Sequence, residues 1–131
     1  MPSTQIEVRR SHAPAVETAI IDAVHDSLVA AFAIPVQDKH VRLVAHEPHR
    51  FAVPHTLSSP EHYTLVTVDC FAGRSVDAKR ALYREIVDRL GALGIPGDHI
   101  TIVVRDLDTA SWGISGGQAA CDVELGFDIN V

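Results

Sequence analysis

The sequence predicts an α+β fold in which two tandem β-α-β units form a four-stranded mixed sheet with both helices on one face. Three observations support this expectation. Apolar residues recur at helical spacing in two segments, strand-like runs flank each of these segments, and one short phrase occurs twice. The phrase begins with an Ile-Pro pair, at Ile34-Pro35 and again at Ile95-Pro96, and continues through an aspartate into a strand-like run. The chain therefore repeats itself after about 61 residues.

The first half opens with the strand-like residues 3–9. Residues 11–32 follow, with apolar side chains three and four positions apart, a spacing typical of an amphipathic helix. A second strand-like run covers residues 41–46. The apolar residues that mark the helix are Val16, Ala19, Ile20, Ala23, Val24, Leu28 and Phe32.

The second half has the same order of elements. Residues 63–70 and 100–107 are strand-like, and a helix is expected between them over residues 76–93. Ser75 is suited to cap the N-terminus of this helix and Gly94 to end it. The apolar stripe of the helix consists of Ala78, Leu82, Ile86, Leu90 and Leu93.

These segments predict a single domain over residues 1–131. Its pseudo-repeats cover residues 2–47 and 63–107, a linker rich in proline and histidine covers residues 47–62, and residues 108–131 form a C-terminal segment. A β-α-β crossover makes its two strands parallel and is right-handed almost without exception. We therefore expect two such units related by a pseudo-twofold axis.

Two helices on one face leave the other face of the sheet uncovered. Successive side chains of a strand point to opposite faces, so the apolar strand residues cannot all face the helices. We expect a symmetric homo-oligomer to cover the second face. The residues that lead to this expectation are Ile6, Val8, Leu65 and Val103.

Composition and charge exclude several classes of function. The 131 residues are 47% hydrophobic and carry a net charge of −6, from eleven Lys+Arg and seventeen Asp+Glu. This acidic balance argues against nucleic acids and anionic membrane surfaces as partners. No apolar run reaches the roughly 18 residues of a membrane span, and no signal-peptide pattern opens the chain. The expected location is therefore the cytoplasm.

No pattern in the chain indicates a metal site or a cofactor. Four histidines lie within seventeen residues, but their spacing fits no compact zinc pattern, so a solvated linker is expected. The two cysteines, Cys70 and Cys121, are too few for a disulfide framework, and their apolar or small neighbours predict buried thiols. The four histidines are His46, His49, His55 and His62.

The predicted topology brings four parts of the chain to one rim of the sheet. If the first strands of the two halves lie antiparallel in the centre, Pro2 at the start of one lies near Arg74, after the end of the other. The second strand begins at the same edge, with Asp38 just before it. The fourth strand ends there and leads into the loop of residues 108–117, which contains Trp112.

The residue types at this rim suit chemistry on a small acid. Removal of Met1 would leave a secondary amine at Pro2; an α-amino group titrates at roughly 7.7–8.0, and lower when desolvated, which suits a general base. Arg74 beside the free amides of a helix N-terminus could hold a carboxylate. Asp38 could assist a second proton or a water, and Trp112 could exclude solvent.

Each of these residues also has a simpler interpretation. Asp38 could be a turn residue, as Asp98 is expected to be in the other half. Arg74 could be a solvated surface charge, although a cation at a helix N-terminus is mildly unfavourable. Trp112 could belong to the core.

Taken together, these residues resemble the tautomerase superfamily, whose members use an N-terminal proline on a β-α-β building block. Within it, the chain is most similar to the malonate semialdehyde decarboxylase branch. The resemblance covers nearly the whole length. Besides Pro2, it rests on the phrase at 22–26 (Asp-Ala-Val-His-Asp), the turn at 34–39, His46-Glu47-Pro48, Arg74-Ser75 and Trp112-Gly113.

The resemblance implies roles for the residues at the rim. Pro2 would be the catalytic amine, Asp38 the carboxylate that assists it, and Arg74 the ligand of a substrate carboxylate. Trp112 and Ile114 would form an apolar wall, with Phe127 as a further candidate. One departure is that decarboxylases of this kind often carry two arginines at the exit of the third strand, whereas residues 71–74 contain one. Candidates for a second cation, contributed by a neighbouring subunit, are Arg9, Arg10 and Arg42.

Two classes of function follow. The first is a cofactor-independent enzyme for small 2-oxo or semialdehyde carboxylates, chiefly a keto-enol tautomerase, with decarboxylation or hydration as further activities. The second is a catalytically inactive, oligomeric protein that binds small anions on the same scaffold. Retention of Met1 would favour the second class. If each chain corresponds to two short subunits of a hexameric relative, analogy implies a homotrimer.

Overall fold

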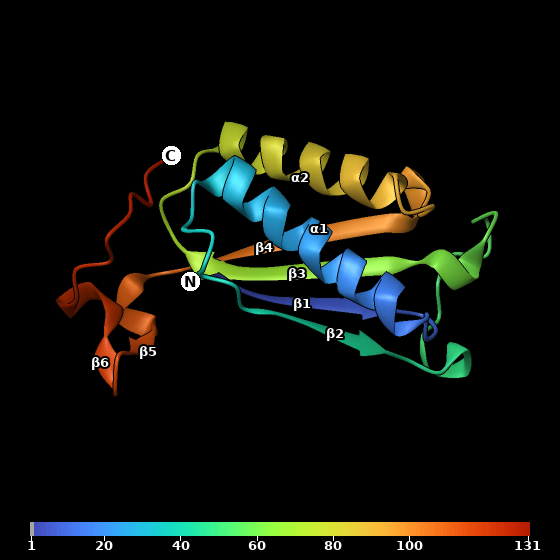
Figure 1. Ribbon diagram of the computed structural model, residues 1–131, viewed down its shortest axis with the longest axis horizontal. Helices are drawn as coiled ribbons and strands as arrows, with labels where there is room; N and C mark the ends of the chain where they lie inside the picture. The colour runs from blue at the N-terminus through green and yellow to red at the C-terminus, as the bar shows by residue number, and fades with distance from the viewer. Residues whose placement is uncertain (1) are drawn as a thin grey trace.

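In the computed structural model, which describes residues 2–131, strands β1 (Pro2–Val8) and β3 (Thr64–Phe71) run antiparallel at the centre of a four-stranded sheet. Strand β2 (Val41–Ala45) pairs in parallel with β1, and β4 (Ile100–Leu107) pairs in parallel with β3. The strand order is β2-β1-β3-β4. Helices α1 (Pro14–Phe32) and α2 (Val76–Gly91) lie together on one face of this sheet (Figure 1). The predicted fold is confirmed.

Buried and partly exposed residues alternate along the two central strands, and this alternation separates the core from the uncovered face. In β1 and β3 every second residue is buried beneath the helices, and the residues between them are partly exposed. Ile6 and Val8 therefore face the helices, whereas Leu65 and Val103 point to the opposite side. The buried strand residues are Pro2, Thr4, Ile6 and Val8 of β1 and Thr64, Val66, Val68 and Cys70 of β3.

The uncovered face is more polar than the apolar strand residues suggested. A shallow hollow on it is lined by side chains that are all polar or charged, and Arg105 makes two hydrogen bonds to the carboxylate of Asp69. Apolar exposure on this face is limited to scattered residues such as Val103. The hollow is lined by Gln5, Glu7, Arg42, Thr67, Asp69 and Arg105.

Both helices differ slightly from their predicted bounds. Helix α1 begins at Pro14 rather than at residue 11, because the fixed backbone of proline suits the first helical turn and needs no amide donor there. Helix α2 begins where expected, with the Ser75 hydroxyl accepting a hydrogen bond from the Ala78 amide at 3.0 Å. It ends at Gly91, two residues before the last residue of the predicted stripe.

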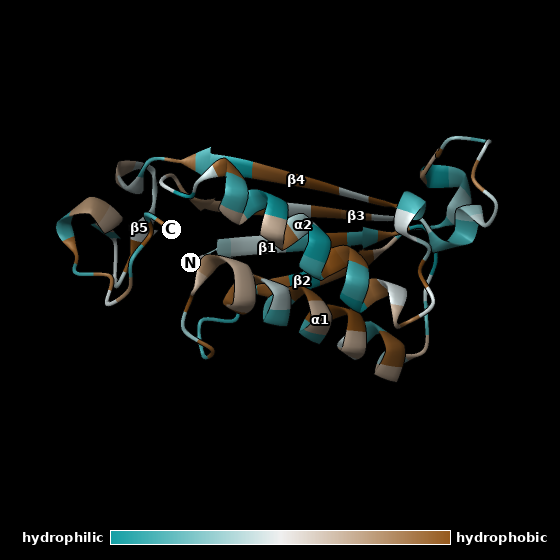
Figure 2. Ribbon diagram, turned by 90° about the horizontal axis from the view of Figure 1, so that it is seen from above, coloured by the Kyte–Doolittle hydropathy of each residue, from teal (hydrophilic) through white to brown (hydrophobic). Residues whose placement is uncertain are grey.

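The helices bury their apolar stripes against the sheet. Figure 2 shows hydrophilic residues on much of the outward side of α2 and hydrophobic stretches in the strands beneath. The helical residues at the centre of this core are Ile20, Val24, Leu28 and Phe32 of α1 and Leu82, Ile86 and Leu90 of α2.

Some of the connections contain short helical turns. The linker between the halves contains the 3₁₀ turns η1 (Pro48–Arg50) and η2 (Pro60–His62), and η3 (Gly97–His99) precedes β4. Just before the linker, a ring nitrogen of His46 lies 3.0 Å from the carboxylate of Glu7, and the His46 ring packs against Phe51 of the linker. Neither helix of the described residues is long and apolar enough to cross a membrane.

After β4 the chain leaves the sheet as a small arm and then returns (Figure 1). The arm contains η4 (Thr109–Ser111), the two-stranded hairpin β5 (Gly113–Ile114) and β6 (Gln118–Ala119), and η5 (Ala120–Asp122). The last residues run back to the start of α2, where the Ser75 amide donates to the Val131 carbonyl at 2.9 Å. Because Cys121 lies in the arm it is exposed, so the prediction that both thiols are buried is wrong for this one.

Candidate functional site

Pro2 lies at the start of β1, at the rim where the ends of several elements meet. It is buried, and in the sheet register it lies opposite Cys70 near the end of β3. Met1, whose removal the amine requires, lies outside the described residues.

Asp38 reaches the same rim from the turn between α1 and β2. The Asp38 amide donates to the Pro35 carbonyl at 3.0 Å, and Nε2 of His40 lies 2.9 Å from the Asp38 carboxylate. The His40 carbonyl in turn accepts from the Thr4 amide of β1 at 2.9 Å. These contacts fix the Asp38 carboxylate beside the first residues of β1.

Arg74 is the most unusual polar residue of the rim, because this arginine is only 6% exposed. One terminal nitrogen, Nη1, donates to the Phe71 carbonyl at 2.9 Å, and the guanidinium carbon lies 5.0 Å from the centre of the Phe32 ring. The other two nitrogens, Nε and Nη2, are buried and have no partner among the described residues. Burial lowers the pKa of Arg74, while Cys70 and the carboxylates of Asp106 and Asp128 act in the opposite direction.

The thiol of Cys70 is part of the same surroundings. Its Sγ lies 3.7 Å from the carboxylate of Asp106, which also pairs with Lys79 of α2. Burial is the main cause that raises the pKa of Cys70 to about 11. The thiol is therefore protonated near neutral pH and is not suited to act as a nucleophile.

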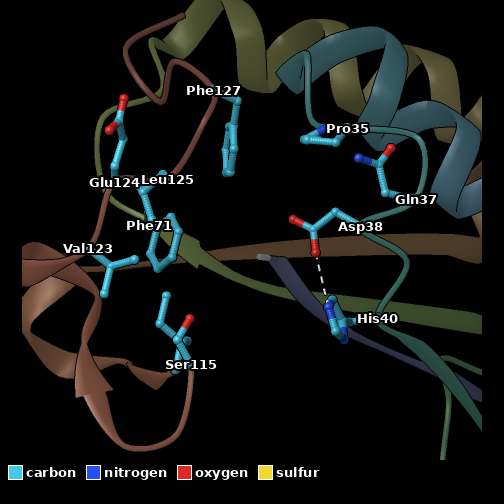
Figure 3. A pocket seen from close by; sticks show the side chains of 11 residues that line it. Pro35, Gln37, Asp38, His40, Phe71, Ser115, Val123, Glu124, Leu125 and Phe127 are labelled. Carbon is cyan, nitrogen blue, oxygen red and sulfur yellow. Dashed lines mark ion pairs between the residues drawn. The ribbon is translucent and has the colours of Figure 1, made fainter.

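A cavity of about 420 Å³ opens in front of Asp38. Figure 3 shows the Asp38 carboxylate pointing into the space between its own turn and the returning C-terminal segment. Phe71 lies across this space from Asp38, beside Val123 and Leu125. The turn contributes Pro35, Gln37, Asp38 and His40, the arm contributes Ile114 and Ser115, and the C-terminal segment contributes Val123, Glu124, Leu125 and Phe127.

Trp112 does not line this cavity but contacts Phe71, which does. Its ring packs edge-on against Phe71, with ring centres 5.1 Å apart. The indole nitrogen is buried and has no hydrogen-bond partner among residues 2–131. Trp112 and Arg74 therefore contact Phe71 from different sides, one through its ring and the other through its carbonyl.

The structure brings most of the predicted site residues to one end of the sheet. Asp38, Ile114 and Phe127 line the cavity, whereas Pro2, Arg74 and Trp112 do not; Pro2 and Arg74 are buried and Trp112 is partly buried.

The candidates for a second cation lie elsewhere in the subunit. Arg9 follows the far end of β1 and donates to the Phe51 carbonyl of the linker, and Arg10 is next to it. Arg42 donates to the Ser3 hydroxyl on the uncovered face. Within one subunit, none of the three lines the cavity in front of Asp38.

The sequence analysis did not predict that His40 and residues 123–125 line the cavity. His40 had a signal, since it follows Asp38 by two residues at the start of a parallel strand and so lies at the same edge. Residues 123–125 had no such signal in the sequence, because they show no helical or strand periodicity.

A family model described as "Tautomerase enzyme" matches residues 38–115, more than half of the chain. The chain belongs to this tautomerase family. The matched region of this tautomerase-family protein includes Asp38, Arg74, Trp112 and Ile114, and Pro2 lies before it. A comparison with curated proteins gave no match.

Solved structures of similar proteins have the same fold. The FG41 malonate semialdehyde decarboxylase, inhibited by 3-bromopropiolate, is 26% identical over 89% of this chain and 92% of its own, with a TM-score of 0.79. A fused 4-OT in a symmetric trimer is 29% identical over 90% of this chain and 95% of its own, with a TM-score of 0.70. A further malonate semialdehyde decarboxylase is 22% identical over 93% of this chain and 99% of its own, with a TM-score of 0.81.

Proposed function

We propose that this tautomerase-family protein is a cofactor-independent enzyme that interconverts the keto and enol forms of small 2-oxo carboxylates through the amine of Pro2. In this proposal Met1 is removed, Arg74 binds the substrate carboxylate, and Asp38 assists proton transfer. Ile114 contacts the apolar part of the substrate, and Trp112 packs against Phe71 of the cavity lining.

The observation that carries the proposal is the buried guanidinium of Arg74 with two unpartnered nitrogens. A buried donor without an acceptor costs about 1–3 kcal/mol, and more when it is charged. A substrate carboxylate would supply two acceptor oxygens in the fork geometry that guanidinium groups match. The buried indole nitrogen of Trp112 is a third donor beside Phe71, suited to a carbonyl or enol oxygen.

The reaction needs one group that accepts and returns a proton. In the direction from enol to ketone, the Pro2 nitrogen takes the hydroxyl proton of the enol and the electron pair of the O–H bond forms the C=O bond. The C2=C3 double bond becomes a single bond, and its electron pair takes a proton at C3 from the same nitrogen. An α-amino group ordinarily titrates at roughly 7.7–8.0. A base that titrates in that range suits both steps at physiological pH.

The carboxylate site favours tautomerisation over decarboxylation. During tautomerisation the carboxylate keeps its charge and its contacts with Arg74. During decarboxylation of a semialdehyde acid, the C–C bond to the carboxylate breaks and the negative charge of the carboxylate moves to the enolate oxygen. A cation bound to that carboxylate therefore stabilises the ground state more than the transition state. The similarity to the FG41 malonate semialdehyde decarboxylase supports decarboxylation as a second candidate activity.

We also propose a homotrimer. Fused 4-OT relatives occur as trimers, and the sheet of this chain has a face that neither helix covers. A neighbouring subunit in such an assembly is the proposed source of the second cation.

The test is the ketonisation of phenylenolpyruvate, the enol of an aryl 2-oxo acid, followed by absorbance. We expect turnover by the wild-type protein and its loss in Pro2→Ala, with unchanged circular dichroism. Equal turnover in Pro2→Ala would exclude Pro2 as the base. Carboxylate binding by an inactive wild-type protein would instead support the anion-binding alternative.

A further inference from the structure

We infer that His25 is a positioning residue that holds the Asp38 turn in its reactive position. His25 lies on α1, is 3% exposed, and has its Nε2 atom 2.7 Å from the carbonyl oxygen of Val36. The inference rests on the proposed role of Asp38, which follows Val36 by two residues.

The hydrogen bond fixes the chemical form of His25. A carbonyl oxygen can only accept, so Nε2 must carry the hydrogen, and in the neutral ring the acceptor lone pair is then at Nδ1. Nδ1 is buried and has no partner among the described residues. An apolar side chain would fill the same space without the cost of a buried, unpaired acceptor. What distinguishes histidine at this position is its hydrogen bond to the Val36 carbonyl.

Besides its internal hydrogen bonds and the contact of His40 with Thr4 of β1, the turn is anchored to α1 by side chains. The side chain of Val36 is 69% exposed and Gln37 is exposed as well, so neither is fixed by the core. The second tether is the ion pair between Lys39 and Asp22 of α1. Asp22 and His25 are three residues apart and lie on the same side of α1. Two side chains of one helix therefore hold the backbone on either side of Asp38.

The position of this backbone determines where the carboxylate points. Asp38 faces the cavity from the turn itself, three residues before β2 begins at Val41, and the turn meets β1 through the hydrogen bond between the His40 carbonyl and the Thr4 amide. A displacement of about 1 Å in a reacting group can lower a rate by roughly 100-fold. Loss of the His25 contact should thus reduce turnover without removing any group that binds the substrate.

The test compares three variants in phenylenolpyruvate kinetics. His25→Leu fills the space but cannot donate, whereas His25→Gln keeps an N–H at a similar reach. Ser27→Ala is the matched control, because Ser27 is also buried on α1 but bonds only to the Ala23 carbonyl of the same helix, at 2.8 Å. We expect His25→Leu to lower kcat about 10-fold with little change in KM, and His25→Gln to stay within about threefold of wild type. Ser27→Ala should leave kcat unchanged.

Amide hydrogen exchange measured by NMR tests the tether without a substrate. Exchange at Asp38 and Lys39 should be faster in His25→Leu and unchanged in Ser27→Ala. Unchanged exchange in His25→Leu, or an equal loss of kcat in His25→Leu and Ser27→Ala, would overturn the inference. An inactive wild-type protein would reject the proposed function instead, and the exchange data would still decide whether His25 holds the turn.

Discussion

The guanidinium carbon of Arg74 lies 5.0 Å from the centre of the Phe32 ring, so the last residue of α1 packs against the residue just before the cap of α2. A desolvated cation over an aromatic face is stabilised by about 2 kcal/mol. This contact orients the guanidinium that we propose as the carboxylate ligand.

Replacement of Phe32 by Leu should therefore affect both stability and substrate binding. We expect the free energy of unfolding in urea to fall by about 1–3 kcal/mol, from lost packing and the lost cation-π contact. KM for 2-oxo carboxylates should rise. Ile20→Val, elsewhere in the core of α1, should cost about 1 kcal/mol and leave KM unchanged. Equal KM values in the two variants would argue against an orienting role of Phe32.

Arg74→Met should separate function from stability. The substitution loses the cation-π contact with Phe32 and the hydrogen bond to the Phe71 carbonyl, but it also removes a buried charge with two unpaired nitrogens. Because these effects oppose each other, the free energy of unfolding should stay within about 1 kcal/mol of wild type. Hydrogen bonds to charged groups contribute about 1.5–3 kcal/mol, which predicts a KM for carboxylates roughly 10- to 100-fold higher. The methyl ester of the same substrate provides the control. An equal rise in KM for the acid and the ester would exclude Arg74 as the ligand of the substrate carboxylate.

Trp112→Phe should preserve the ring contact with Phe71 and remove the buried indole donor. We expect lower kcat/KM with a change in unfolding free energy below about 1.5 kcal/mol. Because Trp112 is the only tryptophan of the sequence, its fluorescence can also follow titration of the wild-type protein with phenylpropanoate. Unaltered fluorescence at saturation would place the bound acid away from Trp112.

The two cysteines should differ in their reaction with iodoacetamide. Burial raises the pKa of Cys70 to about 11, so at pH 8 its thiol stays protonated and unreactive, and its thiolate forms only as the pH approaches 11. Cys121 is exposed and should be the single site of alkylation in the folded protein. Mass spectrometry of Cys121→Ser should show no label at pH 8 until urea is added. Rapid labelling of this folded variant would contradict the burial of Cys70.

The regular part of the fold was predictable because its signals are local. Apolar spacing in residues 11–32 and 76–93 predicted both helices, and the repeated Ile-Pro phrase predicted the two β-α-β units. The start of α1 was less predictable: the structure uses Pro14 at the first turn, and the carboxylate of Glu17 accepts the His12 amide at 3.0 Å, before the helix. Helix ends depend on such individual contacts more than on periodicity.

The shape of the candidate site depends on contacts between distant residues. Arginine is rarely buried, so composition alone favours a solvated Arg74. Its burial follows from the return of the C-terminal segment: Gly73 has a φ of 139°, and a Cβ there would lie 2.9 Å from the Ile129 carbonyl oxygen. This close approach allows the C-terminal segment to pass directly over the start of α2. No local pattern in residues 123–131 predicts it.

The most direct test of the central claim is intact and peptide mass spectrometry of the Cys121→Ser protein after reaction with 3-bromopropiolate. If the Pro2 amine is free and reactive, the chain should lack Met1 and carry one covalent adduct, located on the peptide that begins with Pro2. Arg74→Met should label more slowly, because the carboxylate of the reagent is no longer held. A chain that retains Met1, or an adduct located only at another residue, would contradict the account.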